Sequence, residues 1–209
     1  MNDREKIINR YVERFKVYGP DPIHTLKPGS AEHYKTQHQT HIDSLPSNIS
    51  SVLDVGCGLG NFRRSLNESS KFFGKKINYT GIDIVREFIN YGKNEFKEDK
   101  FFLGTLEEYC VNINENFDAV VFCQVFNNRY EDADNFEVVM KCLELAFSVS
   151  NRVVSCDLIG NYVNFEDPFL YYYSQEEVFS YAKSLTPFVK LDNSYSEFHF
   201  TISLYRGKL

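Results

Sequence analysis

A glycine-rich turn is the part of the sequence best able to bring backbone atoms to a ligand. The run Val52-Leu53-Asp54-Val55-Gly56-Cys57-Gly58-Leu59-Gly60 reads as an apolar strand, a turn and the start of a helix. Glycines at 56, 58 and 60 remove the side chains that would keep a ligand away from backbone N–H groups. Dinucleotide sites use the spacing GxGxxG, in which the helix N-terminus faces a pyrophosphate. The GxGxG spacing therefore disfavours an NAD-dependent oxidoreductase.

Asp83 is the second candidate, because it ends the apolar run Tyr79-Thr80-Gly81-Ile82-Asp83-Ile84. A carboxylate in this place can accept hydrogen bonds from both hydroxyls of a ribose, and such charge-assisted bonds are stronger than neutral ones. Asp83 follows Gly60 by 23 residues, which leaves room for one helix and one strand between them. The glycine turn and Asp83 together predict a site for a ribose-bearing ligand.

The elements that must position these residues form a regular series. From Ser51 onward, short apolar strands alternate with helices, which is the sequence pattern of parallel βαβ units. Strands are expected at 51–55, 77–82, 100–103, 117–123 and 152–157. Apolar residues at helical spacing indicate helices between them, around Phe62 and Leu66, from Val85 to Phe96 and from Phe136 to Phe147.

The two ends of the chain follow different patterns. Two helices are expected before the first strand, one with Tyr11 and Phe15 on its apolar face and one capped by Ser30. Near the other end, Ser174 and Glu177 form a capping-box pattern at the start of the last helix. Extended runs at 188–191 and 198–206 then predict an antiparallel hairpin. The sequence thus predicts one domain over 1–209, with a helical cap over 1–48 and a Rossmann-like core over 51–209.

Residues 51–126 resemble the cofactor half of class I S-adenosylmethionine-dependent methyltransferases. Residues 52–60 are similar to the family's first motif, Asp83 to its ribose-binding acid and Phe117–Gln124 to its fourth motif. The resemblance implies a doubly wound, mostly parallel sheet with a C-terminal antiparallel hairpin. It also implies S-adenosylmethionine as the methyl donor and S-adenosylhomocysteine as the product.

The resemblance assigns cofactor contacts to ten residues. Asp54 and the loop of Gly56, Cys57 and Gly58 would hold the methionine portion, and Ile84 would lie against the adenine. Thr105 stands where many members carry Asp, and with Leu106 it would lie along the adenine edge. Cys123 and Gln124 would lie under the transferable methyl group. For Cys123, a role as a small buried apolar residue is an equal interpretation.

The acceptor site is expected beyond the carboxyl ends of the strands, where ligands bind in open parallel sheets. This placement selects Asn127, Tyr162, Tyr171 and Tyr172 as substrate candidates, and it selects His38 from the helix before the first strand. His199 is the candidate general base, because imidazole titrates near neutral pH. A histidine with satisfied hydrogen bonds on a strand face is the alternative for His199, and simple loop packing is the alternative for the tyrosines.

The whole chain resembles, less specifically, small stand-alone methyltransferases of bacterial glycan and small-molecule pathways. The similar segments are Tyr18-Gly19-Pro20, Val125-Phe126-Asn127 and Phe200–Arg206. The function expected from the resemblance is O-methylation of a sugar, nucleotide-linked sugar or other small polar metabolite. N-methylation and a catalytically silent, cofactor-binding regulatory module are the alternatives.

Composition limits the partners. A net charge of −6 leaves no surplus of Lys and Arg for phosphate backbones, so nucleic acid is not expected as a substrate. The five cysteines form no CxxC pair, which is typical of free thiols in a reducing cytoplasm. The first ten residues contain no apolar signal core, and no run approaches the ~20 apolar residues of a membrane span.

His38 and His41 lack an obvious set of further ligands, so no metal is expected. The sequence carries no signal for a particular oligomeric state.

Overall fold

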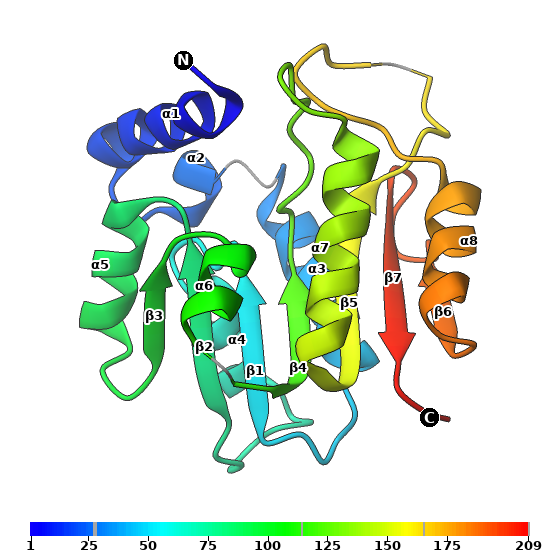
Figure 1. The fold of residues 1–209 in the computed structure, drawn as a ribbon. Coiled ribbons are helices and arrows are strands. Elements are labelled where there is room, and N and C mark those ends of the chain that lie inside the picture. The colour runs from blue at the N-terminus through cyan, green and yellow to red at the C-terminus, as the bar shows by residue number, and fades with distance from the viewer. Residues whose placement is uncertain (27–28, 114, 165, 209) are drawn as a thin grey trace.

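The protein is organised around one seven-stranded sheet. The computed structural model describes residues 1–26, 29–113, 115–164 and 166–208. The strands are β1 (Ser51–Val55), β2 (Asn78–Asp83), β3 (Lys100–Leu103), β4 (Phe117–Phe122), β5 (Ser150–Ile159), β6 (Val189–Asp192) and β7 (His199–Tyr205), and they lie side by side in the order β3-β2-β1-β4-β5-β7-β6 (Figure 1). The first five pair in parallel, whereas β7 is antiparallel to both β5 and β6. The expected fold class is confirmed.

Helices cover both faces of the sheet (Figure 1). Their bounds are α1 (Asp3–Tyr18), α2 (Pro22–Leu26), α3 (Ala31–Ser44), α4 (Asn61–Glu68), α5 (Arg86–Glu95), α6 (Leu106–Asn112), α7 (Asn135–Val149) and α8 (Gln175–Leu185). Side chains of α6, α7 and α8 pack together on one face, and those of α3, α4 and α5 pack on the other. None of the helices in the described segments combines the length and apolar character needed to cross a membrane.

The core explains why the central strands read as continuous apolar runs. Strands β1, β4 and β5 are covered on both faces, so successive residues are buried whichever way they point. Val52 and Leu53, for example, are both fully buried but belong to the two different core clusters. A two-sided core of this kind holds the strand ends rigidly, and these ends carry the candidate site.

Several local expectations hold and several need correction. The five parallel strands, the final hairpin and the Ser30 cap of α3 are all present. Strand β5 is longer than expected, from 150 to 159, because it pairs along its length with both β4 and β7. Only half of the expected capping box of α8 forms: Ser174 accepts the N–H of Glu177, while its hydroxyl donates to Glu176. Short helices α2 and α6 were not expected, because neither is long enough to show a helical period.

The carboxyl ends of the parallel strands meet at one edge of the sheet. From β1 the chain continues outward to β2 and β3, and it then returns to place β4 on the other side of β1. This reversal opens a crevice between β1 and β4 at the carboxyl edge. Helix α1 lies across this edge (Figure 1), with the rings of Tyr11 and Phe15 edge-on to Phe88 at 5.9 and 5.8 Å between centroids.

We expect the sheet core to be sensitive to loss of volume at its centre. Truncating the fully buried side chain in Leu53→Ala should lower the free energy of unfolding by roughly 2–5 kcal/mol, through lost burial and the cavity that remains. Urea denaturation measures this change. The matched control is Val111→Ala, at a side chain that is 82% exposed, which should change stability by about 0.5 kcal/mol or less. Equal effects of the two substitutions would contradict the burial assigned to Leu53.

Candidate cofactor and acceptor site

A cavity of about 400 Å³ lies at the carboxyl edge of the sheet. This volume is within the range of small-molecule and cofactor pockets. The fold brings all ten residues that the sequence selected for cofactor contact to its wall, namely Asp54, Gly56, Cys57, Gly58, Asp83, Ile84, Thr105, Leu106, Cys123 and Gln124. These residues come from four separate segments of the chain, which the fold brings together around one cavity.

The glycine turn needs glycine for both conformation and space. Gly56, Gly58 and Gly60 have φ values of 74, 52 and 74°, in the left-handed region that side chains disfavour. A Cβ atom at Gly56 would lie 2.7 Å from Val125 Cγ2, which is too close. The N–H groups of Gly56 and Cys57 both donate to the carbonyl of Ile82, at 2.7 and 2.9 Å. The turn is therefore held against the end of β2, next to Asp83.

Asp83 is fixed in place before any ligand binds. Its Oδ2 accepts the Gly58 N–H and its Oδ1 accepts the Val85 N–H, both at 2.8 Å. Each oxygen keeps a lone pair for a further donor. Burial raises the pKa of Asp83 to about 6, although these backbone N–H groups oppose the rise. The carboxylate is thus oriented to receive two hydroxyl donors on its free sides.

Asp54 is the second acid in the cavity wall and is 1% exposed. The Tyr79 hydroxyl donates to its Oδ2 at 2.5 Å. Burial raises the pKa of Asp54 to about 7, and the charge of Asp83 adds to the rise. Arg4 is the only lysine or arginine among the described residues that line the cavity, and its Nη1 already lies 2.8 Å from Glu108 Oε1. Two acids without a matching cation favour a positively charged ligand.

The remaining cavity wall contains residues that the sequence did not select. Ile7 and Tyr11 reach it from α1, Leu26 from α2, and Phe88 from α5. The helical period of α1 shows an apolar face but does not say what that face covers. Thr105, by contrast, has a clear local role, since its Oγ1 accepts the Glu108 N–H and caps α6.

The substrate candidates separate into two groups. His38 lines the cavity, its Nδ1 lies 2.7 Å from Ser65 Oγ, and burial lowers its pKa to about 3. Asn127, Tyr162, Tyr171 and Tyr172 are not part of the lining. Tyr162 is 65% exposed and donates its hydroxyl to Glu176, and Tyr172 accepts the Asp167 N–H. Tyr171 packs edge-on against Tyr173 at 4.7 Å.

His199 lies beside a second histidine that the sequence did not pair with it. His199 begins β7 opposite Ile159 of β5, and its ring centroid is 4.5 Å from that of His33 in the first turn of α3. Burial lowers the pKa of both imidazoles below the ordinary value, and the negative charge of Asp157 partly opposes this in each case. Two neutral imidazoles at neutral pH therefore meet at the carboxyl edge.

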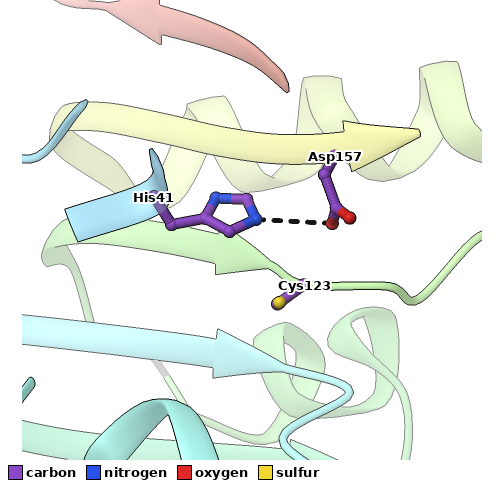
Figure 2. A group of neighbouring side chains, drawn as sticks. All are labelled: His41, Cys123 and Asp157. Atoms are coloured by element: carbon purple, nitrogen blue, oxygen red, sulfur yellow. Dashed lines mark hydrogen bonds and ion pairs between the residues drawn. The ribbon is translucent and has the colours of Figure 1, made fainter. Parts of the chain in front are cut away.

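Three side chains of metal-ligating type also come together here. Donor atoms of His41, Cys123 and Asp157 lie within 4.8 Å of one another, with His41 from α3 and Asp157 from β5 (Figure 2). Sequence reasoning missed this set, because its members are far apart in the chain. His41 Nε2 lies 3.3 Å from Asp157 Oδ1, and Nδ1 lies 2.8 Å from Ser155 Oγ. Hydrogen bonds thus engage both ring nitrogens of His41, and the expectation of no metal stays a prediction.

Comparison with known proteins defines the class. Residues 52–146 match a family model described as a methyltransferase domain. These residues run from β1 through most of α7 and include most of the cavity wall. No curated protein matches the sequence.

Solved structures show the same fold over nearly the whole chain. Magnesium protoporphyrin IX methyltransferase from Synechocystis PCC 6803, with bound S-adenosylhomocysteine, superposes with a TM-score of 0.68 at 11% identity and covers 99% of this chain and 100% of its own. A plantazolicin methyltransferase gives 0.66 at 15% identity, with 99% and 100% covered. An S-adenosylmethionine-dependent methyltransferase from Clostridium acetobutylicum gives 0.61 at 15%, with 96% and 99% covered.

The family match, the fold and the cavity agree. The methyltransferase domain matched over residues 52–146 and the class I fold of the chain together indicate an S-adenosylmethionine-dependent methyltransferase. The cofactor's sulfonium carries the positive charge that the paired acids favour, and its ribose has the two hydroxyls that Asp83 is oriented to receive.

We expect Asp83→Asn to weaken S-adenosylhomocysteine binding by roughly 10- to 150-fold, or about 1.5–3 kcal/mol. The substitution removes the charge and one acceptor from a buried carboxylate that two backbone N–H groups already hold. Titration calorimetry measures the affinity. Asp43→Asn, at an exposed acid on α3, is the control and should bind normally. Unchanged affinity in Asp83→Asn would exclude Asp83 from the cofactor site.

The two raised pKa values predict that the affinity for S-adenosylmethionine increases with pH. Asp54 and Asp83 lose their protons around pH 7 and 6, and only the ionised forms attract the sulfonium. Cation binding should therefore release protons and tighten between about pH 5.5 and about pH 8. The neutral thioether of S-adenosylhomocysteine should show a weaker pH dependence. The measurement is the ratio of the two Kd values across this range, and a constant ratio would refute the electrostatic argument.

Proposed function

We propose that the enzyme methylates a hydroxyl oxygen of a sugar, nucleotide-linked sugar or other small polar metabolite, and that His199 accepts the hydroxyl proton. The observation that carries this proposal is the His33–His199 pair, two half-buried imidazoles from different elements whose ring centroids are 4.5 Å apart. A neutral imidazole at the carboxyl edge can act as a general base at neutral pH. The free thiols of all five cysteines are consistent with the cytoplasm as the location.

The ten cavity residues would hold the cofactor in the roles that their chemistry allows. Asp83 would accept the ribose hydroxyls, and Ile84, Thr105 and Leu106 would border the adenine. Asp54 and the glycine turn would receive the methionine portion. When bound, S-adenosylmethionine supplies a methyl group that its sulfonium has already activated. The protein must then align the acceptor, exclude water and remove one proton.

Two buried polar atoms support a polar acceptor. Nε2 of His33 and Oδ1 of Asn127 are shielded from solvent and have no hydrogen-bond partner among the described residues. Buried polar atoms are normally paired, and leaving them unpaired costs free energy. A hydroxyl-rich acceptor would supply both donors and acceptors to such atoms. Asp157 is the nearby formal charge that both histidines sense, which favours an uncharged hydroxyl over an anionic group.

The test uses labelled S-adenosylmethionine and a panel of sugars, nucleotide-linked sugars, other small alcohols and amines. We expect transfer to a hydroxyl compound. On that acceptor, His199→Gln should lower kcat by about 10²- to 10⁴-fold, the usual contribution of a general base. The rate should also lose its fall at low pH, because the imidazole that must be neutral to accept the proton has been removed. His24→Gln, at an exposed histidine on α2, is the matched control.

Three outcomes would contradict the proposal in different ways. A His199→Gln enzyme with an unchanged rate and pH profile would remove His199 as the base. Methylation confined to the amines would make the enzyme an N-methyltransferase. Tight S-adenosylhomocysteine binding with no transfer to any compound would favour the regulatory module. Binding of S-adenosylhomocysteine to His199→Gln is expected to be normal, since His199 does not line the cofactor cavity.

A further inference from the structure

Gln124 has an unusual backbone conformation. It is the one residue other than glycine that has a positive φ, 58°, among the described residues. A side chain in this left-handed conformation is strained, and such strain persists only where the surroundings hold it. Gln124 follows Cys123 at the end of β4 and lines the cofactor cavity. The structure must therefore contain an interaction that keeps this residue in place.

A closed triangle of hydrogen bonds does so. The backbone N–H of Gln124 donates to Asp157 Oδ1 at 2.6 Å, and its side-chain Nε2 donates to Gln37 Oε1. Nε2 of Gln37 in turn donates to Asp157 Oδ2 at 2.8 Å. Gln37 and Asp157 are both fully buried. The Gln37–Gln124–Asp157 triangle thus joins α3, the loop after β4 and the end of β5.

His41 helps to keep Asp157 ionised, which is the form that best accepts the hydrogen bonds of the Gln37–Gln124–Asp157 triangle. Its Nε2 points at Asp157 Oδ1 (Figure 2), and because an ionised carboxylate only accepts, Nε2 carries the proton. Burial alone would raise the pKa of Asp157, but the hydrogen bonds from His41 and from the Gln124 N–H hold it below its ordinary value. An ionised carboxylate accepts stronger hydrogen bonds than a neutral group.

The position of Gln124 determines the wall around the cofactor. Cys123 on one side of it and Val125 on the other both line the cavity. Val125 packs directly on the glycine turn, so closely that a Cβ at Gly56 would overlap its Cγ2. A relaxed backbone at Gln124 would move both neighbours and break this contact.

We propose that Gln37 and Asp157 are positioning residues, which hold Gln124 in its left-handed conformation so that the 123–125 wall is preformed before the cofactor binds. Neither residue needs to touch the cofactor for this role, and neither lines the cavity. The proposal rests on the assignment of this cavity to the cofactor and not on the general base.

The test compares one substitution in two backgrounds. Gln37→Met keeps the length of the side chain but removes both of its hydrogen bonds, and it should weaken S-adenosylhomocysteine binding about tenfold by calorimetry. In a Gln124→Gly background a positive φ carries no strain. There, the same Gln37→Met change should weaken binding less than about twofold, because there is no strained residue to hold. Gln39→Met, on the exposed side of α3, is the control and should bind as the unaltered protein does.

A purely structural role for Gln37 gives a different pattern. If the residue only packs α3 against the sheet, binding weakens equally in both backgrounds, and that result would overturn the proposal, as would no effect in either. If Gln37→Met does not fold, hydrogen exchange in the unaltered protein decides. The Gln124 amide should then exchange as slowly as those of β4, whereas exchange at the rate of an exposed loop would overturn the proposal. None of these readouts depends on His199, so failure of the base assignment remains distinguishable.

Discussion

Burial of three carboxylates at one edge of the sheet is the constraint on which the site depends. Asp54 of β1 and Asp83 of β2 line the cavity, whereas Asp157 of β5 is outside its lining. The three side chains are 1%, 8% and 0% exposed. Buried charge is costly unless it is paired or hydrogen-bonded. The protein offsets the cost of this buried charge to different degrees at the three sites. The pKa values of Asp54 and Asp83 are raised, whereas that of Asp157 is lowered. Divergent environments indicate divergent roles: the first two acids have interactions still to make with a ligand, whereas Asp157 is satisfied by the protein.

The satisfied carboxylate accounts for the unusual packing of α3. Of the five buried residues of this helix, only Ile42 is apolar, and the others are Gln37, His38, His41 and Ser44. Such a helix gains less from burial than an apolar one, but its hydrogen bonds have fixed directions and define its position. His41 and Ser44 engage Ser155, while Gln37 engages Asp157. The interface between α3 and β5 therefore fixes the position of the helix more than it adds stability. In this position α3 places His33 and His38 at the carboxyl edge.

The ten residues of the cavity wall could be selected from sequence because their features are local. A glycine turn and an acid at a strand end are each visible in a short stretch of sequence, and the strand–helix alternation is visible along 51–157. The topology of parallel strands then brings these features together. Asp83 and Gly58 are 25 residues apart, yet one βαβ unit is enough to join them. The short helix α6 escaped detection for the converse reason, since seven residues show no clear period.

The acceptor side could not be read in the same way. Gln37 bonds a residue 120 positions away, and the His33–His199 contact joins the first turn of α3 to the start of β7. No spacing rule connects such residues, because their meeting depends on where β7 inserts between β5 and β6. Sequence reasoning therefore selected His199 by its place at a strand end but had no means to find its partner His33.

This difference has a physical consequence for function. In the proposed site the cofactor would be held largely by backbone groups and by two acids on neighbouring strands of the sheet, so its recognition would be a property of the fold. The proposed acceptor contacts come from α3 and β7, whose positions are set by the Asp157 network and by strand insertion. Helix α1, which covers the cavity, has no fully buried residue. Its Tyr11, Val12 and Phe15 pack on a small buried cluster, and its exposed ion pairs stabilise little. The cavity wall is therefore held in two different ways, since directional, buried hydrogen bonds fix residues 123–125 whereas non-directional packing of partly buried apolar side chains holds the covering helix.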